Sequence, residues 1–383
     1  MLSPEYPPYV VGGLGAHVGH LAPELAQRGV NVHVVTPRLN RGEAEERDGN
    51  LSVSRVDGPP DLPEYFLDRW RILNRSLFER AAEILRAKPG PWLVHGHDWL
   101  VGEACTRLQH ECSQPLLATI HATEWGRNHG IHNDVQRSVH AQEQKLAAAA
   151  DHIIACSHFM AKQVSDVFGV PPSKIDVIPN GVDVSHLIDT TFDRAAFRAQ
   201  YAQPDEPIVL QVGRVVGEKG IFTLLDAIPR ALAEVPKVRF IVVGSGPALE
   251  EARKRAAGHR WSSRVLFTGF VADEVRNRLY QVADAAVFPS IYEPFGIVAL
   301  EAMALGVPVV SSNAGGLAEV VDDQTAVVVE PDSAQSLARG IVAALRHPDP
   351  ARTDRAKVKA TTQFTWGSIA DETVSMYRRM LPG

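Results

Sequence analysis

The sequence of 383 residues lacks the features that mark secreted and membrane-spanning proteins. It has only three cysteines, Cys105, Cys112 and Cys156; the odd count argues against a disulfide framework, and the spacing is unlike that of a metal-binding motif. We expect them to be small buried residues in a reducing cytoplasm. No apolar run approaches the roughly 20 residues needed to span a bilayer. Because no basic segment followed by an apolar one opens the chain, no signal peptide is expected. The predicted location is cytoplasmic.

The chain also lacks a large excess of charge of either sign. Its formal net charge is −6 and its isoelectric point about 6.2, which give no electrostatic reason to expect nucleic acid or an acidic membrane as a partner. A hydrophobic content of 45% is ordinary for a protein with a full core. Because the length exceeds that of most single domains, we predict two domains.

Several cofactor and metal motifs are missing. Val18 stands where a dinucleotide-binding G-x-G-x-x-G loop would have its third glycine, and no glycine-lysine-serine or glycine-lysine-threonine of a P-loop occurs. The segment from His95 to Trp99 suggests a metal site, but a metallo-hydrolase pattern of this kind needs an acid where Trp99 stands. No D-x-D triplet is present. We therefore predict neither a metal nor a cofactor.

Apolar runs of strand length alternate with helical patterns along the whole chain, which indicates parallel sheets covered on both faces. The expected strands are Val30–Thr36, Trp92–His95, Leu116–His121, His152–Ser157, Ile175–Pro179, Ile208–Val212, Val238–Gly244, Val265–Phe267, Ala285–Pro289, Val307–Ser311 and Ala326–Val329. The expected helices are Leu14–Arg28, Leu62–Lys88, Val135–Ala150, Phe159–Phe168, Phe222–Glu234, Leu249–Ala257, Glu274–Val282, Ser333–Arg346, a short helix around Arg355–Thr362, and Trp366–Met380.

Three local features qualify this pattern. Only a stub of a strand precedes the first glycine-rich loop, and Pro23 is expected to kink or split the first helix. Strand periodicity lapses over Asn180–Pro207, where polar residues and prolines cluster. We therefore predict two doubly wound α/β domains, residues 1–185 and 186–365, facing each other across a cleft.

The stretch from Ser290 to Ala304 holds two carboxylates eight residues apart. A buried strand is predicted to end just before it, and a helix to begin near Pro294. Glu293 then lies in the loop and Glu301 on the second turn, about 7.5 Å further along the helix axis. The first amides of this helix, around Gly296, favour an anion such as a phosphate. Glu301 could then reach a ribose and Glu293 a sugar hydroxyl.

The spacing of Glu293 and Glu301 resembles the E-x7-E signature of retaining glycosyltransferases with the GT-B fold. The wording EPFGIVALEAMALGVPVV is similar to glycosyltransferase family 4 and the bacterial and archaeal glycogen synthases. The resemblance covers essentially the whole chain. It implies two Rossmann-like domains, an acceptor-side domain followed by a nucleotide-sugar-binding domain, with a C-terminal helix, residues 366–383, that crosses back onto the first domain.

Two glycine-rich loops match this family. Gly12 and Gly13 alone would be read as a tight turn, and Arg214 and Lys219 alone as a solvated pair of loop charges. The resemblance implies that all four lie near the diphosphate of the donor, where a fork-shaped guanidinium and a point charge can neutralise it. It also implies donor contacts from the loop containing Val271 and from the segment Glu293, Phe295, Gly296, Ile297, Val298 and Glu301.

The first half carries the remaining matches. A lone histidine at a strand end is more often structural, but His121 resembles the family histidine that lies against the donor sugar. Asp98 resembles an acidic residue on the acceptor side, although it could simply cap the next helix. Thr123, Glu124 and Arg127 are expected to shape the acceptor site. The wording HATEWGR is similar to bacterial α-glucosyltransferases.

The resemblance thus implies a retaining, metal-independent hexosyltransferase that uses UDP-glucose or ADP-glucose and a carbohydrate acceptor, an α-glucan or related glycoside. His121, Glu293, Asp98, Arg214 and Lys219 are its expected catalytic residues. Three alternatives stay open: a nucleotide-sugar 2-epimerase of the same fold, a glycosyl phosphorylase, and a sugar-binding protein without activity. The retention of both cations and both glutamates argues against the last.

Overall fold

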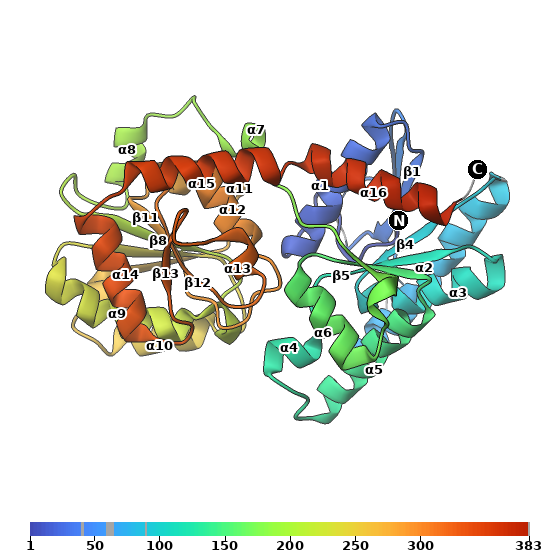
Figure 1. Ribbon diagram of the computed structural model, residues 1–383, viewed down its shortest axis with the longest axis horizontal. Helices are drawn as coiled ribbons and strands as arrows, with labels where there is room; N and C mark the ends of the chain where they lie inside the picture. Colours follow the sequence, from blue (N-terminus) through green and yellow to red (C-terminus); the bar gives the residue numbers. More distant parts are fainter. Residues whose placement is uncertain (40–41, 59–64, 89, 382–383) are drawn as a thin grey trace. The chain divides into compact units, whose positions relative to one another are not determined.

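A computed structural model describes residues 1–39, 42–58, 65–88 and 90–381. The chain forms two compact units (Figure 1): unit 1 contains Met1–Gly181 and Trp366–Gly383, and unit 2 contains Val182–Thr365. The chain leaves unit 1 slightly before the predicted boundary at residue 185. It returns to unit 1 at Trp366, the first residue of the helix that was expected to come back.

Unit 1 is built on two ladders of strands. One has the order β1-β3-β2, and the other the order β4-β5-β6-β7; every pair is parallel except β2 with β3. The strands are β1 Val32–Pro37, β2 Glu45–Asp48, β3 Leu51–Val56, β4 Val94–His97, β5 Leu116–Ile120, β6 His152–Ala155 and β7 Ile175–Val177.

The N-terminal stub joins these two ladders. Leu2 forms parallel bridges to Val35 of β1 and to Gly96 of β4. The Leu2 amide donates to the His95 carbonyl over 2.8 Å, and the His97 amide donates to the Leu2 carbonyl over 3.0 Å. Leu2 is itself buried. The predicted stub therefore acts as a very short central strand, with β1 on one side and β4 on the other.

The helices of unit 1 cover this sheet and include α1 Gly13–Gln27, α2 Phe66–Ala87, α3 Gly102–Cys112, α4 Glu124–Asn128, α5 Asp134–Ala149, α6 His158–Phe168 and α16 Trp366–Met380. Pro23 does not split the first helix, because α1 is continuous with Pro23 inside it. Proline removes one backbone hydrogen bond, but the buried face of Val18, Leu21 and Leu25 holds the helix on the core. α16 contributes Trp366 and Ile369 to that same core.

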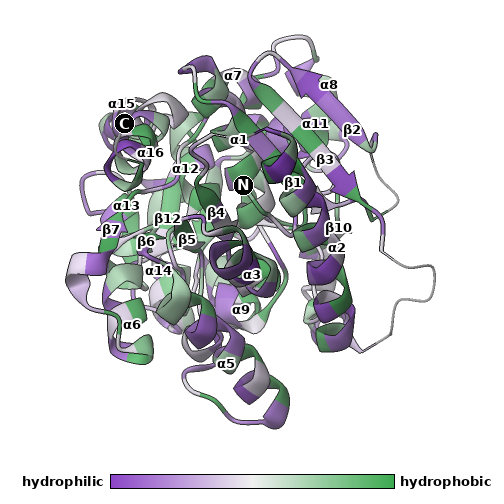
Figure 2. Ribbon diagram, turned by 90° about the vertical axis from the view of Figure 1, so that its right-hand side faces the viewer, coloured by the Kyte–Doolittle hydropathy of each residue, from purple (hydrophilic) through white to green (hydrophobic). Residues whose placement is uncertain are grey.

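The pair β2 and β3 was not predicted. Glu45–Asp48 is exposed along its whole length and has no apolar alternation, as its uniformly hydrophilic colour in Figure 2 shows. Its register comes from pairing with β3, in which Leu51 and Val53 are buried. The start of the predicted helix Leu62–Lys88 lies outside the described residues, and α2 begins at Phe66.

Unit 2 has one parallel sheet of six strands in the order β10-β9-β8-β11-β12-β13. The strands are β8 Ile208–Val212, β9 Arg239–Val243, β10 Val265–Gly269, β11 Ala285–Phe288, β12 Val309–Ser312 and β13 Val327–Val329. Its larger helices are α9 Ile221–Glu234, α10 Leu249–Ala257, α11 Asp273–Val282, α12 Ile297–Ala304, α14 Ala334–Arg346 and α15 Pro350–Gln363. The predicted strands and helices of this half are all present, although α15 is longer than expected.

The strand order of unit 2 is that of a doubly wound sheet. Numbered from β8, the strands run 3-2-1-4-5-6, so the winding reverses between β8 and β11. Ligands of such sheets bind beyond the carboxyl ends of the strands at this reversal. With the Leu2 stub as its first strand, unit 1 reverses in the same way between the stub and β4. The fold thus marks one candidate crevice in each unit.

Candidate functional site

The reversal in unit 2 brings together the two loops that the sequence singled out. The loop after β8 carries Arg214 and Lys219, and the loop after β11 carries Glu293. Lys219 Nζ donates a short hydrogen bond to Glu293 Oε2. The Glu293 side chain is almost fully buried, whereas that of Lys219 is about one quarter exposed. Lys219 is therefore a cation that Glu293 holds in place at the end of the sheet.

Arg214 is arranged differently from Lys219. It is exposed, and within the described part of the chain its guanidinium has no hydrogen-bond or ion-pair partner. Gly213 beside it has φ +142°, a conformation that favours glycine. The guanidinium is thus available to a ligand without first breaking a contact.

Backbone contacts fix the two loops to each other. The amides of Ile291 and Tyr292 both donate to the Glu218 carbonyl, over 2.8 and 3.2 Å. Gly220 has φ +71°, and a Cβ there would lie 1.9 Å from the Pro289 carbonyl oxygen. Glycine is therefore required for this close approach. Together these contacts set the position of Lys219 relative to Glu293.

Glu301 lies on the second turn of α12, as predicted. Tyr280 of α11 donates its hydroxyl to Glu301 Oε2 over 3.3 Å, and Arg276 Nη2 lies 4.0 Å from Oε1. Burial raises the pKa of Glu301 above its usual value, while Arg276 and the Tyr280 hydroxyl oppose the rise. Tyr280 and Arg276 were not predicted, and only the packing of α11 against α12 reveals them.

The start of α12 is suited to an anion. Gly296 precedes it with φ +115°, and a Cβ there would lie 2.6 Å from Leu317. Ile297 and Val298 are half-buried, and the first amides of a helix have no acceptor within it. The Phe295 ring, by contrast, is buried and packs edge-on against Phe364 at 5.8 Å. Its expected donor contact can therefore come only from its backbone.

Val271 lies in the loop that follows β10. This loop is open to solvent, since Phe270 is 72% exposed and Val271 is half-buried. The Gly269 carbonyl, just before it, accepts the Gly244 amide over 2.9 Å. The loop thus has a fixed base and an exposed apolar tip.

In unit 1, the glycine-rich loop already holds a carboxylate of the chain itself. Glu5 Oε2 accepts the amides of Val11 and Gly12, over 2.8 and 3.2 Å. Gly12 is the residue before α1, and Gly13 is the first residue of that helix. The role of Glu5 was not predicted, because a glutamate seven residues before a glycine pair matches no recognised pattern.

Asp98 and His121 lie at the ends of neighbouring strands, β4 and β5. Asp98 Oδ1 accepts the His121 amide over 2.7 Å, and Asp98 makes no side-chain cap to the following 3₁₀ helix. The capping alternative is therefore wrong. Asp98 has φ +60° and is buried, and burial raises its pKa to about 6.

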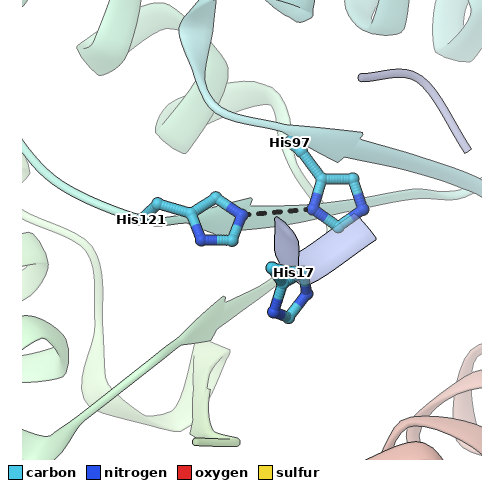
Figure 3. Close-up of side chains that lie close together, drawn as sticks. All are labelled: His17, His97 and His121. Carbon is cyan, nitrogen blue, oxygen red and sulfur yellow. Dashed lines mark hydrogen bonds between the residues drawn. The ribbon is translucent and has the colours of Figure 1, made fainter. Parts of the chain in front are cut away.

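Two further histidines gather beside His121 (Figure 3): His17 from α1 and His97 from the end of β4. His97 Nδ1 and His121 Nε2 are 3.3 Å apart, and His17 Nδ1 is 2.7 Å from Asn180 Oδ1. Burial lowers the pKa of His17 and of His121 to about 3, and that of His97 well below its usual value. At neutral pH all three rings are therefore uncharged.

The predicted acceptor residues divide into two kinds. Thr123 is a correction: its side chain is fully buried, accepts the Gly126 amide over 2.9 Å and donates to Gln163 over 2.8 Å, so it caps α4 and is not open to a ligand. Glu124 and Arg127 are partly exposed, with Arg127 Nη1 3.8 Å from Glu124 Oε2. Among the four predicted acceptor residues, Glu124 and Arg127 are thus partly exposed, whereas Asp98 and Thr123 are buried.

Glu143 of α5 contacts the first residue of α4. Its two carboxylate oxygens accept the Glu124 amide over 2.8 and 3.1 Å, and its side chain is buried. Burial raises the pKa of Glu143 to about 8, although the Glu124 amide and Arg127 oppose the rise. This contact was not predicted, because nothing in the spacing of the α5 residues marks Glu143 as buried.

None of the helices described here is long and apolar enough to cross a membrane.

Comparison with known proteins matches each half of the chain to a glycosyltransferase family model. Residues 11–186 match Glycosyltransferase Family 4, and residues 193–362 match Glycosyl transferases group 1. A glycogen synthase of Mycobacterium tuberculosis is 34% identical over 98% of this chain and 93% of its own length.

Solved structures share the fold. A sucrose-phosphate synthase from Thermosynechococcus elongatus superposes with a TM-score of 0.83 at 28% identity, covering 99% of this chain and 98% of that one. Anabaena HepE, solved in complex with UDP-glucose, superposes with a TM-score of 0.78 at 20% identity, covering 99% and 98%. These matches indicate a glycosyltransferase. The two doubly wound units and the Lys219–Glu293 pair are consistent with it. The chain belongs to glycosyltransferase family 4 and is a glycosyltransferase with the GT-B fold.

Proposed function

We propose that the protein is a retaining, metal-independent hexosyltransferase that moves glucose from a nucleotide-diphospho-sugar to an α-glucan or related glycoside. The observation that carries the proposal is the Lys219–Glu293 pair at the reversal of the unit 2 sheet, with Arg214 exposed in the same loop as Lys219. The donor class is supported by the UDP-glucose complex of HepE, and the acceptor class by the glycogen synthase relative.

In this proposal unit 2 holds the nucleotide and the leaving diphosphate. Arg214 and Lys219 offset the negative charge that develops on the diphosphate as the bond from the anomeric carbon to its oxygen breaks. The first amides of α12, at Gly296, Ile297 and Val298, add further donors to the phosphate. Glu301 accepts from the ribose, and Glu293 from the hydroxyls of the sugar. The exposed loop at Val271 covers the base.

Unit 1 supplies the acceptor side. The acceptor hydroxyl attacks the anomeric carbon from the face that the diphosphate leaves, and its proton passes to a phosphate oxygen. The His121 carbonyl lies against the developing positive charge of the sugar. Asp98 holds the His121 backbone in place through the 2.7 Å hydrogen bond. Gly12 and Gly13 allow the diphosphate to approach α1 closely, and Glu124 and Arg127 contact the acceptor.

A donor screen tests the proposal. Release of nucleoside diphosphate is followed with UDP- and ADP-glucose, each with and without a glucan, and each in excess EDTA. We expect glucan-dependent release with one of the two donors, unchanged by EDTA. Release that stops in EDTA and returns only with Mg²⁺ or Mn²⁺ would contradict the metal-independent mechanism. Nucleotide-sugar isomerisation without an acceptor would instead favour the epimerase.

A further inference from the structure

The histidine cluster of unit 1 has more ring nitrogens than hydrogen-bond partners. His17 and His97 are both buried, and within the described residues neither Nε2 atom has a hydrogen-bond partner. A buried polar atom without a partner is uncommon and costs free energy. In the neighbouring His95, by contrast, both ring nitrogens have a hydrogen-bond partner. Its Nδ1 lies 2.7 Å from the Tyr377 hydroxyl and its Nε2 lies 2.7 Å from the Thr119 hydroxyl.

The three rings converge on one point. One nitrogen from each of His17, His97 and His121 lies within 4.8 Å of the other two (Figure 3). Two imidazole nitrogens bound to one tetrahedral zinc ion would be about 3.3 Å apart, given Zn–N distances of about 2.0–2.1 Å. His97 Nδ1 and His121 Nε2 already have a separation of 3.3 Å. A gap of up to 4.8 Å closes to the same value with a shift of roughly 1.5 Å.

The surroundings have the chemistry of a metal site. Uncharged imidazole is the form that binds zinc-class ions. Asn180 Oδ1, 2.7 Å from His17 Nδ1, accepts the proton of that nitrogen and so leaves Nε2 as the ligand atom, the arrangement usual for metal-bound histidine. His121 is only half-buried, which gives an ion and a water molecule as fourth ligand a way in.

We propose that His17, His97 and His121 form a binding site for a zinc-class transition metal ion, and that the bound ion inhibits the enzyme. One of the two facing nitrogens of His97 and His121 carries a proton in the metal-free protein. On binding, the lone pairs of both facing nitrogens turn to the metal, and each of these two rings carries its proton on the other nitrogen. The ion therefore gives His17 Nε2 a partner, whereas His97 binds through Nδ1 and its Nε2 keeps the proton. The inhibition rests on the proposed function, which places His121 against the donor sugar; metal binding itself does not.

Cobalt(II) titration of the metal-free, full-length protein tests the site, because four-coordinate cobalt has intense visible absorption bands. We expect one equivalent to give these bands and zinc to displace it. His17→Gln removes a ligand and should weaken binding by more than the roughly 10- to 100-fold typical of losing an outer-shell partner. His20→Gln, on the same helix but outside the three-ring group, should bind as the wild type does.

Asn180→Ala provides a test that does not remove a ligand. Loss of the acceptor behind His17 should weaken binding about 10- to 100-fold, even if His17→Gln fails to fold. Absence of the four-coordinate bands in the wild type, or unchanged binding in Asn180→Ala, would overturn the site.

Inhibition is measured separately. With the donor found in the screen, zinc should lower turnover of the wild type and EDTA should restore it. Cobalt binding without any loss of turnover would overturn the inhibition and leave the site itself standing. If the donor screen finds no activity, the spectroscopic titration still decides whether the metal site exists.

Discussion

Lys219 is a residue whose charge is held in place by its neighbours. Its ammonium contacts the buried Glu293 carboxylate, and its carbonyl accepts the Gln211 side-chain amide over 3.2 Å. Among the described residues Arg214 has no comparable partner, and it is exposed. One loop thus carries two cations, one held by a buried carboxylate and one open to solvent.

Removal of either cation should slow turnover more than it weakens acceptor binding. We expect Lys219→Ala and Arg214→Ala each to lower kcat about 10²–10³-fold, since each offsets charge on the departing diphosphate. Steady-state kinetics with the preferred donor measures this, with Lys254→Ala on α10 as a control. Near wild-type kcat in both variants would show that these residues do not stabilise the leaving group.

The ionisation of Glu143 should make the stability of the folded protein depend on pH. Its pKa is about 8 in the folded protein against 4.5 ordinarily. Below about pH 4.5 the carboxyl is neutral in both folded and unfolded chains, and above about pH 8 it is charged in both. The folded state therefore binds the proton more tightly, and the contribution of Glu143 to stability falls as pH rises between these values.

Glu143→Gln keeps an oxygen for the Glu124 amide but cannot ionise. The free energy of unfolding of the wild type should fall relative to that of the variant between about pH 5 and about pH 8. Urea unfolding of both proteins at the two pH values gives the difference, from which titrating groups that do not interact with Glu143 cancel. A difference that does not change with pH would mean that Glu143 is not buried as described.

At the scale of elements, α16 belongs to the core of unit 1. The Trp366 ring stacks on His20 at 5.3 Å and 14°, and a Cβ on Gly181 would lie 2.8 Å from Trp366. Trp366 is 4% exposed and Ile369 0%. The last helix therefore completes unit 1, although a long segment of chain separates it from the rest of that unit.

Trp366→Ala should destabilise unit 1 by about 3–5 kcal/mol, the usual cost of removing a buried tryptophan. Hydrogen exchange followed by mass spectrometry should show faster exchange in α1 and α16, with α9 of unit 2 unchanged. Val358→Ala, at a position 60% exposed, is the matched control and should leave exchange as it is. Unchanged protection of α1 in Trp366→Ala would contradict the core role of the helix.

At the scale of the whole molecule, the prediction concerns the stereochemistry of the product. An inverting enzyme needs a base opposite the leaving group to deprotonate the acceptor. Asp98 is the candidate in unit 1, but its Oδ1 is engaged by the His121 amide. We therefore expect an α-linked product from an α-configured donor such as UDP-glucose. The coupling of the anomeric proton in the NMR spectrum of the product distinguishes an α from a β linkage. A β-linked product would mean that the enzyme inverts and that Asp98 acts as the base.

Much of unit 2 could be predicted from its sequence. Strands such as β8 and β11 are short buried apolar runs, and helices such as α9 and α14 have a clear apolar face, so local periodicity is sufficient to find them. The spacing of Glu293 and Glu301 on either side of a helix start is likewise a local property.

Contacts between distant segments could not be predicted in this way. The exposed strand β2 carries no apolar pattern and exists only through its pairing with β3. α1 continues through Pro23 because of the core beneath it. Glu143 and Tyr280 contact partners 19 and 21 residues away, which no local spacing reveals.

The alternation of strands and helices, the two-domain organisation and the family could be read from the amino-acid sequence, because each depends on residues close together in the chain. Which side chains meet depends instead on the tertiary structure. His17, His97 and His121 come from α1, β4 and the end of β5, and they converge because parallel strands bring their carboxyl ends to one edge of the sheet. The order in which the strands pair decides which side chains become neighbours, and local sequence patterns do not predict that order.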